Sequence, residues 1–172
     1  AQLDPSALTV TEDGAPIGNV QIQPSIDPQQ SFAVALLVDT DGSMNDAGKL
    51  DATKKALAGF VDALGPQDTV ALFSVSNQVK VLQGYTSDKS ALKNAIGQLS
   101  ANGSAAIYDA VDQASQLQGA LPQQRKVLLL LADGGDTASK QSLDAASGAA
   151  QSAQVPVYAI GLGQAVHHDV LD

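Results

Sequence analysis

The stretch FAVALLVDTDGSM, residues 32–44, joins a continuous apolar run to a polar loop that begins abruptly at Asp39. An unbroken apolar run of this kind is typical of a strand that is buried on both faces of a parallel sheet. Asp39, Asp41 and Ser43 follow at a spacing of two, so two carboxylates and a hydroxyl come just past the end of the strand. The stretch therefore predicts a central strand of an α/β fold, with polar side chains at the edge of its sheet.

The remainder of the chain alternates between strand-like and helix-like patterns. Apolar runs predict further strands over residues 68–76, 126–133 and 155–163, and a shorter, more exposed strand over 78–83. Apolar side chains at helical spacing predict helices over residues 47–64, 88–99, 107–117 and 138–153. This alternation indicates an α/β fold: an open, mostly parallel, doubly wound sheet with helices on both faces. In such sheets, sites form beyond the carboxyl ends of the strands, which singles out the loops at Asp39 and Asp133.

The first 30 residues have a different character. Asp13-Gly14 is a turn signal between two short segments with strand-like patterns, as in a β-hairpin. A Pro-rich, polar segment follows and is typical of a linker. We therefore expect an N-terminal β-hairpin over residues 1–24, a linker over 25–30 and one α/β domain over 31–172.

The composition excludes several classes of partner and of chemistry. Acidic residues outnumber basic ones 18 to 9, and the formal charge of −9 makes nucleic acid and anionic membranes unsuitable partners. The longest apolar runs are far too short for membrane insertion. The absence of cysteine removes thiol chemistry, zinc–thiolate sites and disulfides. What remains suits a cation held by oxygen atoms, or a partner that brings positive charge through a metal.

The sequence DTDGSM, residues 39–44, resembles the opening motif of the haloacid dehalogenase-like phosphatases. That resemblance implies Asp39 as the nucleophile and Asp41 as the general acid of a Mg²⁺-dependent phosphatase. The chemistry also needs a lysine near the phosphate. The nearest basic candidates, Lys126 and Lys140, lie in no evident motif, so the resemblance is confined to one short segment.

A second resemblance extends over nearly everything after Ser31. The first loop, the next helix and the strands after it read DTDGSM, KLDATKKALAGFVDAL and DTVALFSVSNQVKVLQGYT. Later segments read GSAAIYDA before the third helix, LLLLADGGD at the end of the fourth strand and VPVYAIGLG in the last strand. In this order the segments resemble a von Willebrand factor A-type domain, which has a Rossmann-like fold.

This resemblance implies a metal-ion-dependent adhesion site at the carboxyl edge of the sheet. In A-type domains the site is an octahedral Mg²⁺ site of hard oxygens, where two Ser and one Thr bind directly and two Asp act through water. The ion can then take a carboxylate from a partner protein as a further ligand. In this chain Asp39, Ser43 and Asp133 match the motif.

Two motif positions depart from the family pattern. Asp41 replaces the first Ser and adds a negative charge, and Ala105 replaces the Thr, with Ser104 one residue away as a possible substitute. Both changes make a bound ion a weaker acceptor for a partner's carboxylate. Without an ion, the crowded carboxylates should raise the pKa of at least one of them. We therefore expect a degenerate site that binds Mg²⁺, Mn²⁺ or Ca²⁺ through Asp39, Asp41, Ser43 and Asp133.

The resemblance implies a non-enzymatic, adhesion-type protein-binding module of a bacterial protein, either secreted or surface-anchored. An extracellular or cell-envelope location is expected, because similar hairpins with an E-D-G turn precede A-type domains in bacterial surface proteins. The expected partner is a protein that offers an acidic side chain. Its expected contacts lie in the loops around residues 39–46, 100–106 and 133–137, at Met44, Asn45, Asn102, Gly134 and Asp136. A Mg²⁺-dependent phosphatase and a metal-free structural scaffold remain open as alternatives.

Two further expectations concern the second half of the chain. Asp136 is expected to cap the helix over residues 138–153. The ending HHDVLD resembles the start of the family's last helix. We therefore expect the domain to lack most of that helix and the edge strand that follows it.

Overall fold

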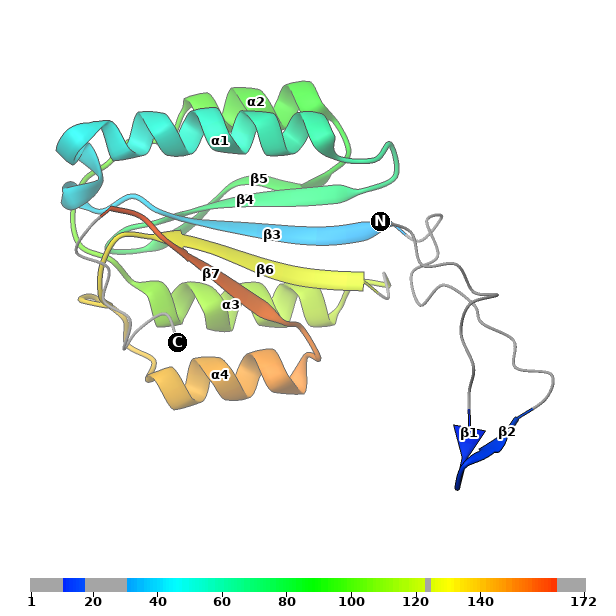
Figure 1. Cartoon of the computed structure of the whole chain (residues 1–172). Coiled ribbons are helices and arrows are strands. Elements are labelled where there is room, and N and C mark those ends of the chain that lie inside the picture. Colours follow the sequence, from blue (N-terminus) through cyan, green and yellow to red (C-terminus); the bar gives the residue numbers. More distant parts are fainter. Residues whose placement is uncertain (1–10, 18–30, 123–124, 164–172) are drawn as a thin grey trace. The chain divides into compact units, whose positions relative to one another are not determined.

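A computed structural model describes residues 11–17, 31–122 and 125–163, and the chain divides into two compact units at residue 30 (Figure 1). In the first unit, β1 (Thr11–Glu12) pairs antiparallel with β2 (Ala15–Pro16) around a turn at Asp13-Gly14. Gly14 has a φ of +82°, a conformation that glycine adopts without steric cost. The hairpin turn is therefore present, while the linker at 25–30 lies outside the described residues.

The second unit is an α/β domain with a five-stranded sheet. Its strands are β3 (Phe32–Asp39), β4 (Thr69–Val75), β5 (Val79–Thr86), β6 (Arg125–Ala132) and β7 (Val157–Gly161). They lie in the order β5-β4-β3-β6-β7, and only β5 runs antiparallel to its neighbour. The predicted open, mostly parallel, doubly wound sheet is thus confirmed.

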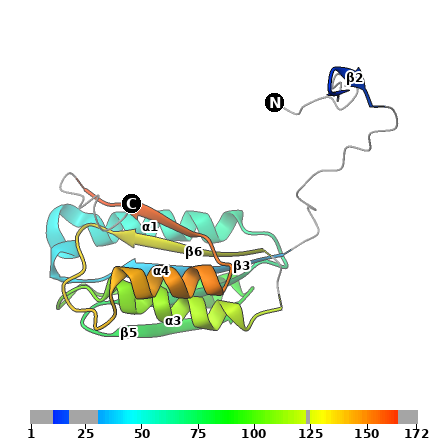
Figure 2. The ribbon, with the colours of Figure 1, turned by 90° about the horizontal axis from the view of Figure 1, so that it is seen from below.

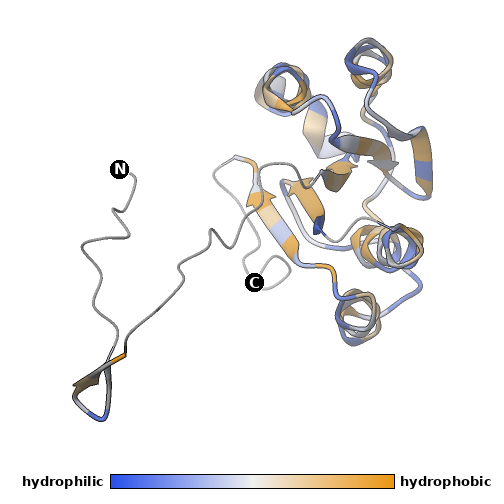
Figure 3. Cartoon of the chain, turned by 90° about the vertical axis from the view of Figure 1, so that its right-hand side faces the viewer, coloured by the Kyte–Doolittle hydropathy of each residue, from blue (hydrophilic) through white to orange (hydrophobic). Residues whose placement is uncertain are grey.

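Helices cover both faces of the sheet, as the alternating pattern predicted. One face carries α1 (Lys49–Ala63) and α2 (Lys89–Gly97), and the other carries α3 (Ile107–Gly119) and α4 (Leu143–Ser152). Figure 2 views the domain with α3 and α4 nearest the reader, and Figure 3 shows the helices end-on around the strands. No helix in the described ranges is long and apolar enough to cross a membrane.

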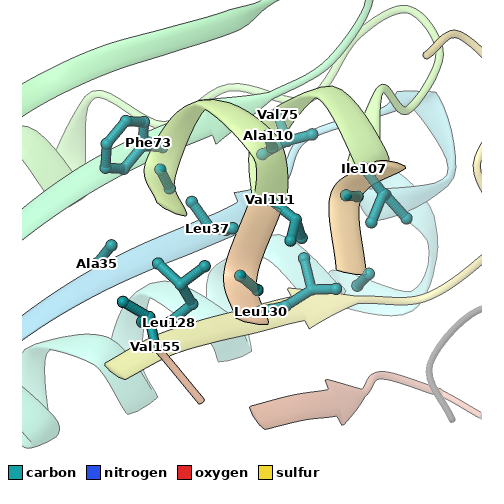
Figure 4. Packing of buried hydrophobic residues seen from close by; sticks show 14 of the residues in the cluster. Ala35, Leu37, Phe73, Val75, Ile107, Ala110, Val111, Leu128, Leu130 and Val155 are labelled. Atoms are coloured by element: carbon teal, nitrogen blue, oxygen red, sulfur yellow. The ribbon is translucent and has the colours of Figure 1, made fainter. Parts of the chain in front are cut away.

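Two apolar cores lie on opposite faces of the sheet, because neighbouring side chains of a strand point in opposite directions. In β3, Ala35 and Leu37 contribute to the core under α3 and α4, which Figure 4 shows. Val34, Leu36 and Val38 contribute to the core under α1 and α2. All five are at most 4 % exposed, which explains why the strand reads as an unbroken apolar run.

The strand order reverses between β3 and β6. From β3 the chain passes through α1 to β4 on one side, and after α3 it returns as β6 on the other side. Val38 lies opposite Leu131, so Asp133 lies just beyond the end of β6, beside Asp39 at the end of β3. Ligand sites of open α/β sheets form at such switch points, and this one brings together the two predicted loops.

The helix predicted over residues 138–153, α4, begins later than the sequence predicted. Its first residue is Leu143, not residue 138, and Ser142 caps it by accepting a hydrogen bond from the backbone N–H of Ala145. The segment between Asp133 and α4 is held to α3 instead, because Asp109 accepts from the backbone N–H groups of Lys140 and Gln141 at 3.0 and 2.8 Å. These bonds hold that segment outside the helix.

Candidate metal centre

The loop that follows β3 and the loop that precedes α3 are joined by main-chain hydrogen bonds. The Gly42 N–H donates to the Gly103 carbonyl at 3.0 Å, and the Asn102 N–H donates to the Thr40 carbonyl at 2.8 Å. Gly103 has a φ of +77°, and a Cβ there would lie 2.6 Å from the Asn77 side-chain oxygen. Glycine adopts this φ without strain, and its small size favours the close approach of the two loops.

Thr40 anchors the loop that carries the site. It is fully buried, and its hydroxyl donates to the Val75 carbonyl at 3.0 Å and lies 2.8 Å from the Ser74 hydroxyl. The next residue, Asp41, accepts a hydrogen bond from the Ser43 backbone N–H at 2.9 Å and so caps a short 3-10 segment, η2 (Gly42–Gly48). An Asp in this position is a common N-cap, because its carboxylate satisfies a free N–H of the first turn.

Three carboxylates converge at the edge of the sheet. Asp39, Asp41 and Asp133 each offer an oxygen, and these oxygens lie within 4.8 Å of one another. The Ser43 hydroxyl oxygen lies between two of them, 2.5 Å from Asp41 Oδ1 and 2.7 Å from each oxygen of Asp133. A hydroxyl has one proton, so it can donate to only one of these three acceptors at a time. The remaining short distances between oxygen atoms are unfavourable unless a proton or a positive charge lies between them.

Asp39 lies at the bottom of the cluster and is fully buried. Its Oδ1 accepts a hydrogen bond from the Asp41 backbone N–H at 3.0 Å, whereas Oδ2 has no hydrogen-bond partner among the described residues. Burial, helped by the charges of Asp41 and Asp133, raises the pKa of Asp39 to about 7, against the backbone hydrogen bonds that lower it. A buried carboxylate with a free oxygen is stabilised by a bound cation.

The donor set fits a hard divalent cation. Carboxylate and hydroxyl oxygens are the ligands that Mg²⁺ and Ca²⁺ prefer, and Asp39, Asp41, Asp133 and Ser43 supply them from two adjacent loops. These are the four predicted ligands, and the structure brings them together.

The position expected to carry the family's Thr contributes no side-chain oxygen. Ala105 is fully buried, and its N–H donates to the Thr137 hydroxyl at 3.0 Å. Ser104 donates its backbone N–H to the Asn77 side chain at 2.5 Å, and no hydrogen bond of its hydroxyl to the three carboxylates occurs in the described structure.

The residues expected to meet a partner differ in exposure. Asn45 and Asn102 are exposed and Gly134 is half-buried, so all three remain available at the edge of the sheet. The expectation for Met44 is wrong for its side chain, because that side chain is fully buried in the core under α1 and α2. A methionine in a polar loop can either contact a partner or pack into the core, and only the fold decides which.

Asp136 is half-buried and caps a different helix from the one expected. Its carboxylate accepts a hydrogen bond from the Tyr108 backbone N–H at 3.0 Å, in the first turn of α3, and it also contacts the Ser139 backbone and hydroxyl. The expectation that it caps the helix over residues 138–153 is therefore wrong. The role of capping α4 belongs to Ser142.

Lys49 is a charged side chain at the site that the sequence did not point to. Its ammonium lies 2.5 Å from Asp133 Oδ2 and 3.4 Å from the Ser43 carbonyl oxygen. This contact with Asp133 raises the pKa of Lys49. The two residues are far apart in sequence, so no spacing rule could have paired them.

A family model described as the von Willebrand factor type A domain matches residues 34–136. No match was found among curated proteins. Among solved structures, a von Willebrand factor type A protein from Catenulispora acidiphila is 24% identical with a TM-score of 0.72, over 83% of this chain and 35% of that one.

Two pilus proteins are also similar in structure. The von Willebrand factor domain of the type V pili tip protein Mfa5 from Porphyromonas gingivalis is 20% identical with a TM-score of 0.59, over 63% of this chain and 39% of that chain. The PilB minor pilin from Streptococcus sanguinis is 21% identical with a TM-score of 0.56, over 64% and 31%. The chain thus spans about a third of the length of these three proteins, and at these identities the likeness shows the fold.

Proposed function

Because the chain belongs to the von Willebrand factor type A family, we propose that it is a non-enzymatic, adhesion-type protein-binding module with an altered divalent-cation site. The observation that carries this proposal is the convergence of three carboxylates and the Ser43 hydroxyl around the free oxygen of buried Asp39. A bacterial extracellular or cell-envelope location, secreted or surface-anchored, is supported by the similarity to a pili tip protein and a minor pilin.

The proposed ligands of the ion are Asp39, Asp41, Ser43 and Asp133, and the proposed ion is Mg²⁺, with Mn²⁺ or Ca²⁺ as substitutes. The bound ion would supply a positive centre at the rim, to which an acidic side chain of a partner protein can bind. Three carboxylates around a divalent ion leave one net negative charge, so the ion attracts a further carboxylate less strongly than an ion with neutral ligands. The contact is accordingly expected to be weak and to depend on the surrounding loops.

The proposed partner surface consists of the loops next to the ion. Asn45 donates a side-chain hydrogen bond to the Ala101 carbonyl at 3.2 Å, which holds the first two loops in one surface. Asn102 and Gly134 flank this surface and are accessible. Met44 is not part of it, because its side chain is buried.

A calorimetric titration tests the cation site. Mg²⁺, Mn²⁺ and Ca²⁺ are titrated into the wild-type protein and into Asp39→Asn and Asp133→Asn, with Asp144→Asn, an exposed residue of α4, as the matched control. We expect binding to the wild type and the control, and at least about a hundredfold weaker binding to both site variants, because each loses a charged ligand. Absence of binding of all three ions to the wild type at millimolar concentration would contradict the proposal.

The phosphatase alternative makes a different demand on Asp39. A nucleophilic carboxylate has to reach the phosphorus atom, but Asp39 is fully buried and its raised pKa of about 7 keeps much of it protonated near neutral pH. Hydrolysis of a generic phosphate ester in the presence of Mg²⁺, abolished by Asp39→Asn, would favour that alternative. If the protein is instead a metal-free scaffold, none of the titrations will show cation binding.

A further inference from the structure

Lys49 occupies an unusual place for a cation. It is the first residue of α1, where the backbone N–H groups and the helix dipole disfavour positive charge. The preceding residues, Ala47 and Gly48, have φ values of +51° and +71°, so two consecutive left-handed residues turn the chain into the helix just before Lys49. An ammonium group therefore lies at the site despite two unfavourable local features, the positive charge at the start of a helix and the left-handed turn before it.

The ammonium group compensates the charge of one carboxylate of the cluster. It lies 2.5 Å from Asp133 Oδ2, and the Asp133 side chain is only 4 % exposed. By contrast, the ion pair Lys93–Asp62 is exposed and lies elsewhere. The same Asp133 oxygens lie 2.7 Å from the Ser43 hydroxyl, so the ammonium group and an ion held by Ser43 and Asp133 would compete for one carboxylate.

The Lys49 side chain has room to leave. Its aliphatic stem passes Gly163, where a Cβ would lie 3.3 Å from Lys49 Cε, so the missing side chain makes space for it. The stem also lines a cavity of about 690 Å³ with apolar neighbours that include Leu131 and Leu162. The side chain is 24 % exposed, so its charged end can turn to water while the stem keeps its contacts.

We propose that Lys49 is a built-in counter-ion that competes with the divalent cation for Asp133, so that binding of the ion requires the ammonium group to leave. This inference rests on the cation site proposed above and adds a means of control to it. The ammonium-paired form stabilises the metal-free site, which sets a threshold concentration that the ion has to exceed. In the metal-bound form, the released ammonium group remains at the rim next to the ion.

The test compares Lys49→Met, which keeps the stem and removes the charge, with Lys49→Arg, which keeps the charge. Lys93→Met is the matched control, because its partner Asp62 lies thirteen residues further along α1, about 20 Å from Lys49. Mn²⁺ affinity is measured by calorimetry, and the unfolding temperature is measured in EDTA and in Mn²⁺. Circular dichroism establishes that each variant is folded, and Lys49→Gln replaces Lys49→Met if the latter is not.

We expect Lys49→Met to bind Mn²⁺ about ten- to a hundredfold more tightly than the wild type, because the competing charged hydrogen bond is gone. Its unfolding temperature should fall in EDTA and recover in Mn²⁺, while Lys93→Met behaves like the wild type and Lys49→Arg binds more weakly than Lys49→Met. Equal or weaker Mn²⁺ binding by Lys49→Met would overturn the inference and leave the cation site standing. Binding by Lys49→Met alone would support the inference but not a cation site in the wild type, and no binding by any variant would overturn both.

Discussion

The two ends of the adjacent strands β3 and β6 differ in how their buried polar groups are stabilised. At the amino end, the fully buried Gln118 of α3 donates both amide hydrogens, to the Ala33 carbonyl at 3.0 Å and to the Val127 carbonyl at 2.9 Å, while its neutral Oε1 has no described hydrogen-bond partner. At the carboxyl end, buried Asp39 has an oxygen without a described partner, and only Lys49 among the described residues forms an ion pair with the cluster. The chain thus closes one end with its own neutral donors, and at the other end it holds a negative charge that a cation can neutralise.

The largest expected effect concerns the pH dependence of stability at the carboxyl end. The pKa of Asp39 rises from 3.8 to about 7 on folding, so the metal-free folded protein binds more protons than the unfolded chain between these values. Stability should therefore increase as the pH falls from about 7 towards 4, by up to about 4 kcal/mol for a shift of this size. Urea unfolding in EDTA at pH 8 and pH 5 should show about 3 kcal/mol of this difference.

Two comparisons isolate the contribution of Asp39. Asp39→Asn should be more stable than the wild type at pH 8 in EDTA and should lose most of the pH dependence, because the buried charge is gone. Saturating Mg²⁺ should reduce the dependence in the wild type, since the ion stabilises the ionised carboxylate. An Asp39→Asn profile parallel to that of the wild type would refute the assignment of the buried charge to Asp39.

The next effect concerns the amino end of these two strands. Gln118→Met keeps most of the volume but leaves the Ala33 and Val127 carbonyls without the amide donor, so we expect the free energy of unfolding to fall by about 2–3 kcal/mol. Cation affinity should not change, because the site lies at the opposite end of the strands. Gln116→Met is the control on the same helix, because Gln116 is exposed and its side-chain amide donates to Asp112. A change in cation affinity in Gln118→Met would contradict the expectation that the two ends of the strands act independently.

The smallest expected effect concerns the affinity of an ion at the carboxyl end for a further carboxylate. Asp41→Ser combined with Ala105→Thr replaces a charged ligand with a neutral one and adds a hydroxyl, and Ser can still cap the turn that Asp41 caps. The ion and its ligands then carry no net charge instead of one negative charge, so acetate, as a probe for a partner's carboxylate, should bind the Mn²⁺-loaded protein about tenfold more tightly. Acetate that binds the ion takes the place of water, so the relaxation rate of water protons caused by bound Mn²⁺ decreases. This decrease measures acetate binding. Ser104→Ala is the control, and acetate affinity in the double variant equal to that of the wild type would contradict the charge argument.

The sequence predicted those features that depend on local pattern and on the sheet's topology. The apolar run ending at Asp39 predicted a strand buried on both faces, and the rule for open sheets placed Asp39 and Asp133 at one edge. The structure confirms the fold class and brings the two residues together. The place of Asp41 and Ser43 in the site was also predicted, because both lie within four residues of Asp39 on the same loop.

The features that the sequence did not predict depend on contacts between distant segments. Lys49 reaches Asp133 only because a left-handed turn at Ala47-Gly48 sets the start of α1, and nothing in a helical pattern indicates such a turn. The delayed start of α4 has the same origin, since Asp109 of α3 binds the backbone N–H groups that would have joined the helix. Tertiary hydrogen bonds outweigh local helix propensity here.

The loops at the carboxyl edge are held together by main-chain atoms: Gly42 to Gly103, Asn102 to Thr40, and the Ala106 N–H to the Ser76 carbonyl at 3.0 Å. Side chains at Asn102 and Ser104 take no part in these three bonds, so they can be exchanged without loss of the loop connections. For protein engineering, this makes the rim a display surface: a randomised library at these two positions can be selected for new partners.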